Sequence, residues 1–74
     1  MQVRTIPHYP RSDVHVVPAD GLWAIKQEHL PRYTRLFATQ YEAIGHAARY
    51  ARDGASLLVI HGADGRFRDV RSYS

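Results

Sequence analysis

The sequence predicts an α+β domain in which an antiparallel sheet of four strands, or five, carries one helix on one face, in the order ββαββ. Two pairs of β-branched or alternating segments are each joined by a short turn containing Asp and Gly, and a segment with helical periodicity separates the pairs. The 74 residues suffice for one small domain and include no cysteine. We assign residues 1–13 to an extended or disordered leader and residues 14–74 to the single domain.

The first hairpin precedes the helix. Val14–Pro18 is rich in β-branched residues and ends at a proline, which is typical of a strand. Asp20 and Gly21 form the turn, because Gly readily adopts the positive φ of a tight turn. Leu22–Gln27 has the alternation of a second strand. After a proline that breaks regular pairing, Arg32–Phe37 could add a further strand.

The helix is predicted over Thr39–Asp53. Thr39 and Glu42 have the spacing of a capping box, with Thr at the N-cap. Gly54 is expected to end the helix at the C′ position. Small and apolar residues fall on one face at helical spacing, namely Ile44, Ala47, Ala48 and Ala51. Such a face lets the helix lie close to a sheet that supplies the larger side chains.

The second hairpin follows the helix. Leu57–His61 is an apolar run that ends on histidine and indicates a central strand. Residues 62–65 form a loop containing two glycines. Arg66–Val70 is the last predicted strand, and residues 71–74 form a tail.

The alternation of side chains along each strand divides the residues between two faces of the sheet. The helix-covered face is predicted to receive Val14, Val16, Trp23, Ile25, Leu58, Ile60 and Phe67. The opposite face, which we call the open face, is predicted to receive His15, Val17, Ala24, Lys26, Leu57, Val59, His61, Arg66 and Arg68. Because one helix covers one face only, function is expected on the open face.

The open face is expected to have an apolar centre and a polar rim, which is the layout of a protein interface. The candidate self-association residues are Val17, Ala24, Leu57 and Val59. The aromatic side chains are predicted on the other face, which disfavours a base-stacking RNA platform. A homo-oligomer, a dimer in the first instance, would also compensate for the small core of so short a chain.

The excess of basic residues lies at the two ends of the chain. The chain has ten basic residues (Lys and Arg) and seven acidic residues (Asp and Glu), whereas residues 14–65 contain five basic and five acidic residues. The candidate binding patch consists of His15, Lys26, His61, Arg66, Arg68 and Arg71. Its arginines could bind nucleic-acid phosphates; alternatively, they could charge an edge strand and so block aggregation.

No motif for catalysis or metal binding is found in the sequence. The five histidines lack the spacing of a metal site, so we interpret them as surface or interface residues, although His15 and His61 could approach each other across strands. Ser56, His61 and Asp64 lack the nucleophile elbow of a hydrolase. We therefore predict no enzyme, no cofactor and no small-molecule substrate.

A cytoplasmic protein without membrane association is expected. No apolar run approaches the ~20 residues that span a bilayer. Residues 1–10 lack the apolar region of a signal peptide, and the lack of cysteine suits a reducing compartment.

Several segments together resemble a family of small bacterial proteins, domain-of-unknown-function family 2188. The segments are His15-Val16-Val17-Pro18, Trp23-Ala24-Ile25-Lys26, Leu58-Val59-Ile60-His61-Gly62 and Asp64-Gly65-Arg66. The resemblance covers about residues 14–74 and implies a compact β-hairpin–helix–β-hairpin domain of a bacterial or phage protein; it points to no particular activity. Turn geometry accounts for the glycines and Asp64 in the last segments, but not for His61 and Arg66.

Two functions are compatible with these patterns. The first is a non-catalytic interaction module that self-associates through the open face. The alternative is a nucleic-acid-binding module that uses the C-terminal arginines.

Overall fold

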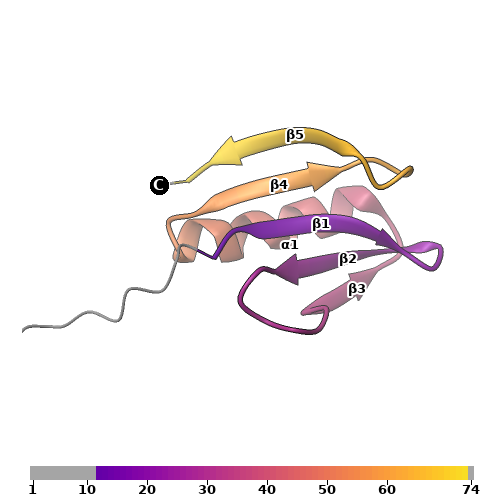
Figure 1. Cartoon of the computed structure of the whole chain (residues 1–74), viewed down its shortest axis with the longest axis horizontal. Helices are drawn as coiled ribbons and strands as arrows, with labels where there is room; N and C mark the ends of the chain where they lie inside the picture. The colour runs from indigo at the N-terminus through magenta and orange to yellow at the C-terminus, as the bar shows by residue number, and fades with distance from the viewer. Residues whose placement is uncertain (1–11, 74) are drawn as a thin grey trace, which may run out of the picture.

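The computed structural model describes residues 12–73 and has the predicted α+β class (Figure 1). The elements in chain order are β1 (Val14–Ala19), β2 (Leu22–Gln27), β3 (Arg35–Phe37), α1 (Gln40–Asp53), β4 (Leu57–His61) and β5 (Phe67–Ser72). One sheet contains all five strands in the order β3-β2-β1-β4-β5, so the optional strand is present as a short edge strand. Most of the predicted leader, residues 1–11, lies outside the described residues.

The sheet is mixed, because its two central strands are parallel. β1 and β4 pair with Val14 opposite Leu58 and Val16 opposite Ile60, whereas every other neighbouring pair is antiparallel. The prediction of a wholly antiparallel sheet is wrong at this one ladder. β3 supplies the reason: it reverses the chain once more after the first hairpin, so α1 returns across the sheet and β4 starts in the direction of β1 (Figure 1).

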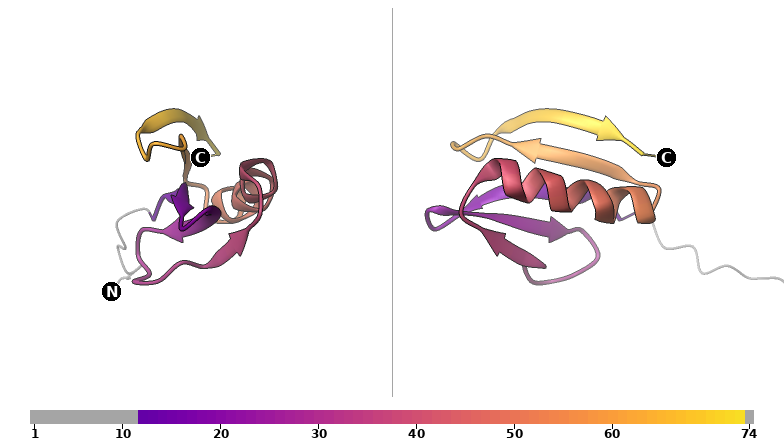
Figure 2. Two further views of the ribbon diagram at one scale, coloured as in Figure 1. Left: turned by 90° about the vertical axis from the view of Figure 1, so that its right-hand side faces the viewer. Right: turned by 180° about the vertical axis from the view of Figure 1, so that it is seen from behind.

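The covered face forms the core (Figure 2). Three helix alanines, Ala43, Ala47 and Ala51, are fully buried and bring α1 close to the sheet. The sheet side of the core consists of Val14, Val16, Ile25, Phe37, Leu58 and Ile60. Trp23 packs partly buried against these residues, as its predicted inward position requires. The four largest fully buried side chains, Ile25, Leu58, Val14 and Val16, are aliphatic.

The two ends of α1 differ in how well the sequence predicts them. Thr39 is the N-cap, and its hydroxyl oxygen accepts a hydrogen bond from the Glu42 N–H at 3.1 Å, as predicted. At the other end Gly54 has a φ of −91°, and the left-handed conformation falls on Ala55, with a φ of +49°. Gly54 is thus the C-cap and not the predicted C′ residue, and Ala55 at C′ adopts the left-handed conformation for which glycine is favoured there.

A β-bulge between Ile60 and His61 changes the faces of β5. Asp69 lies opposite Ile60, but Phe67 lies opposite His61, so one extra residue, Arg68, is accommodated between them. Phe67, predicted on the covered face, instead shares the open face with His61 and is 64% exposed. A bulge shifts the side-chain alternation by one residue, and period-2 patterning cannot anticipate it.

Candidate functional site

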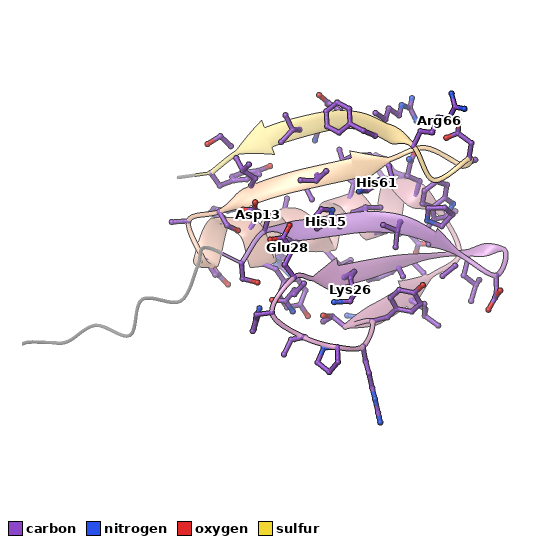
Figure 3. All side chains as sticks on the ribbon, viewed as in Figure 1. Asp13, His15, Lys26, Glu28, His61 and Arg66 are labelled. Atoms are coloured by element: carbon purple, nitrogen blue, oxygen red, sulfur yellow. The ribbon has the colours of Figure 1, made fainter. Side chains whose placement is uncertain are left out.

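Two histidines from the central strands meet on the open face (Figure 3). His15 lies in β1 and His61 ends the neighbouring parallel strand β4. Their rings lie 5.2 Å apart between centroids, and His15 Nδ1 is 3.0 Å from His61 Nε2, within hydrogen-bond distance. The expected approach of these residues across strands is thus present, and we call them the histidine pair.

In each histidine of the pair, the outer nitrogen, meaning the ring nitrogen that faces away from the other histidine, lies within reach of a hydrogen-bond acceptor. His15 Nε2 lies 2.6 Å from the Glu28 carboxylate oxygen Oε2, and His61 Nδ1 lies 3.2 Å from the backbone carbonyl oxygen of Gly65. Glu28 directly follows β2 and is fixed by its backbone N–H, which donates to the Asp13 carbonyl at 3.0 Å. Gly65 belongs to the β4–β5 turn and has a φ of +82°, a conformation that glycine adopts without strain.

These contacts fix where the protons lie. A carbonyl oxygen and an ionised carboxylate can only accept hydrogen bonds, so His61 Nδ1 and His15 Nε2 both carry hydrogen. With only those two protons the pair is neutral, and two lone pairs face each other across 3.0 Å. A cation between the rings, such as one further proton, would let both inner nitrogens act as acceptors at once.

The hydrogen bond from His15 lowers the pKa of Glu28 below its ordinary value of 4.5. Partial burial opposes this shift, while the backbone of Asp13 and the nearby charges of His15 and Lys26 add to it. The carboxylate is therefore ionised at neutral pH and acts as an acceptor. Glu28 was not among the candidate residues predicted from the sequence. Glu28 follows Lys26 by two residues, so the alternation along a strand places both side chains on the same face of the sheet.

The remaining residues of the candidate binding patch do not join the histidine pair. The Lys26 ammonium donates to the carbonyls of Gln27, at 2.9 Å, and Leu30. It is therefore engaged by the β2–β3 loop, which it helps to hold in place.

The three C-terminal arginines are each engaged separately. Arg66, in the β4–β5 turn, is 3.9 Å from Asp64, and Arg71 is 3.7 Å from Asp69. Arg68 donates to the side-chain oxygen of Gln40 at 3.1 Å, at the start of α1. Its predicted place on the open face is wrong, because the bulge places it beside the helix. Arg68 and Arg71 share a hollow of about 160 Å³ that is also lined by Gln40, Ile44, Ile60 and Asp69.

The apolar part of the open face is larger than predicted. Val17, Leu57 and Val59 are half-buried there, but Ala24 is fully buried beneath its neighbours and cannot touch a partner itself. Three residues that sequence reasoning did not place on this face add exposed apolar surface: Leu36, Phe67 and Val70. Leu36 pairs with Ala24, so the alternation along β3 could have identified it once that strand was accepted.

The described chain is thus a small α+β domain with one helix-covered face and one open face that carries a hydrogen-bonded histidine pair. It belongs to a bacterial family, described as "Uncharacterized protein conserved in bacteria (DUF2188)", whose family model matches residues 14–73. The resemblance noted in the sequence is thereby confirmed. Comparisons with curated proteins and with solved structures gave no match. The helix found in residues 12–73, at 14 residues, is too short and too polar to cross a membrane.

Proposed function

We propose that the protein is a non-catalytic interaction module whose open face binds a second copy of the same chain. The observation that carries the proposal is the exposed apolar surface on a face that no element of residues 12–73 covers (Figure 1). Phe67 is 64% exposed, Leu36 49% and Val70 44%. Contiguous apolar surface rimmed by polar groups is the usual sign of an interaction site.

Two features favour a second copy as the partner. The face carries both signs of charge, because Glu28 and Lys26 lie near each other on it, so a two-fold rotation can place the Glu28 of one chain opposite the Lys26 of the other. A domain of this size also gains most from association, because its own core is small. The strands lie about 4.8 Å apart and, apart from the three-residue β3, are about 20 Å long, so the sheet presents roughly 400 Å² in projection. Counted on both chains, this area corresponds to an interface below the standard size.

The hydrogen-bond chain on the open face supports a non-catalytic role. It runs from Glu28 through His15 and His61 to the carbonyl oxygen of Gly65. A carboxylate and histidine that activate a nucleophile need a hydroxyl, a thiol or a water at the far end. Here the far end is a backbone carbonyl, which has no proton to give up.

The alternative, nucleic-acid binding through the arginines, receives less support. Arg66 and Arg71 each have a neighbouring aspartate, and Arg68 is bonded to Gln40, so the three do not form one uncompensated basic surface. Binding of single- or double-stranded probes at low salt, lost on replacing all three arginines by glutamine, would revive this alternative. We expect no such binding.

Self-association is tested by sedimentation velocity over a range from low micromolar to submillimolar protein. We expect the wild type to dimerise and Phe67→Lys to remain monomeric. Tyr41→Lys is the matched control, because Tyr41 is an 87% exposed aromatic residue on the helix. A wild type that stays monomeric throughout, or a Phe67→Lys variant that associates as strongly as Tyr41→Lys, would contradict the proposal.

A further inference from the structure

We propose that the histidine pair binds a divalent first-row transition-metal ion of the zinc class, through His15 Nδ1 and His61 Nε2. The inference stands independently of self-association, since both ligands come from one chain. It starts from the two facing lone pairs, which need a cation between or beside them. A proton satisfies that need, and so does a metal ion that prefers imidazole ligands.

The separation of the two nitrogens suits one ion. Zinc binds imidazole nitrogen at about 2.0–2.1 Å, which places two nitrogens of a tetrahedral site about 3.3 Å apart. The observed distance between His15 Nδ1 and His61 Nε2 is 3.0 Å. Because the lone pairs now face each other, both rings would turn so that the lone pairs converge on the ion. The ion would lie off the line joining the nitrogens, on the solvent side of the pair.

The surroundings of the pair have the pattern that orients histidine ligands in metal sites. Metal-bound histidines usually donate their other ring N–H to a carboxylate or a backbone carbonyl, which fixes the ring and its tautomer. His15 donates to Glu28 at 2.6 Å, and His61 donates to the Gly65 carbonyl at 3.2 Å. Both inner nitrogens are therefore without hydrogen, as a ligand nitrogen must be, before any ion arrives.

The pair is accessible, and neighbouring charge does not block it. The His15 side chain is 22% exposed, which admits an ion while sheltering the rings. The Lys26 ammonium is bonded to the carbonyls of Gln27 and Leu30, and Glu28 contributes a negative charge next to the pair. Residues 12–73 contain no group of three or more suitable ligands, so the pair supplies two and water completes the coordination.

The test uses Zn²⁺ as the probe, titrated into the full chain and followed by calorimetry. We expect binding by the wild type and its loss in His15→Gln and in His61→Gln. Glu28→Gln should weaken binding by about tenfold or more, because the outer carboxylate orients His15 and raises its basicity. His29→Gln is the matched control and should bind like the wild type, since His29 is an exposed histidine bonded to Ser12.

A second measurement on the wild type avoids any doubt about the folding of variants. Long-range ¹H–¹⁵N spectra of the imidazole rings report which nitrogen each ion contacts. We expect Zn²⁺ to shift His15 Nδ1 and His61 Nε2 while the nitrogens of His29 and His46 keep their positions. Absence of Zn²⁺ binding, binding retained in His61→Gln, or shifts confined to other histidines would overturn the proposal.

Discussion

The two faces of the sheet are built from alternate residues of the same strands, yet they differ in almost every physical respect. In β4, Leu58 and Ile60 are buried under α1, while the alternate residues Val59 and His61 point to the open face. The covered face is a close-packed aliphatic core; the open face has a chain of polar hydrogen bonds among half-buried and exposed apolar side chains. The packing that stabilises the fold thus lies on one face, and the other is the face that we propose for recognition.

The largest expected difference between the two faces is in stability, and it is tested by removing one aromatic side chain from each face. Phe37, 9% exposed, packs in the core, whereas Phe67 is 64% exposed. We expect Phe37→Ala to lower the free energy of unfolding by about 3 kcal/mol. Phe67→Ala should change the free energy of unfolding of the monomer by less than about 0.5 kcal/mol. Urea unfolding at a protein concentration below association checks both values, and equal losses would refute the division of roles. Phe37→Leu replaces the alanine variant if the latter does not fold.

The helix that covers one face depends on its cap. Thr39 accepts a hydrogen bond from the Glu42 N–H, so Thr39→Ala should lower the free energy of unfolding by about 1 kcal/mol. Thr39→Ser, which retains the hydroxyl, should lose much less. Thermal unfolding of the two variants measures the difference. Equal effects of serine and alanine would show that the cap contributes little to covering the sheet.

The other end of the helix offers a smaller gain. Ala55 has a φ of +49°, a left-handed conformation that costs a non-glycine residue about 1–2 kcal/mol. Glycine relieves this strain but loses more entropy on folding, so Ala55→Gly should stabilise the fold by about 0.5 kcal/mol. Ala63→Gly, at a position without positive φ, should give no gain. If both variants lose stability equally, the conformation assigned to Ala55 is wrong.

The smallest expected effect on stability lies on the open face and depends on pH. The folded-state pKa of Glu28 is lowered from 4.5, so its stabilising contribution is complete above about that pH and is lost as the pH falls through the lowered value. The effect is small because the side chain is 48% exposed. The urea midpoint of Glu28→Gln should lie below that of the wild type at neutral pH and converge with it in acid. A difference that stays constant with pH would contradict the predicted role of the carboxylate.

Local patterns in the sequence predict the elements of this fold well, and the path of the chain less well. Thr39 and Glu42 mark the helix start, and the alternation along β1 and β4 places His15 and His61 on one face. The parallel pairing of β1 and β4 depends on whether the three residues of β3 form a strand. That short segment follows a proline-containing loop, and its own pattern is too brief to decide the matter.

The candidate site is also predictable only in part, because local patterns indicate which face a residue lies on but not the path of the chain that brings residues together. Extending the alternation of β2 past Lys26 would have included Glu28, but its contact with His15 requires the turn of the chain after β2. The positions of Phe67 and Arg68 follow from the bulge opposite His61, which leaves no mark in the hydrophobic pattern. The fold therefore keeps Arg68 and Arg71 together beside the helix and separates them from the histidine pair on the open face.

The most direct test of the central claim is an isotope-filtered NMR experiment on a mixture of labelled and unlabelled wild-type chains. Contacts between chains appear there as intermolecular nuclear Overhauser effects. We predict such effects from the side chains of Val17, Val59 and Phe67, and none from the exposed Tyr41 of α1. Intermolecular effects confined to the helix, or their absence at submillimolar concentration, would contradict the account that the open face binds a second copy.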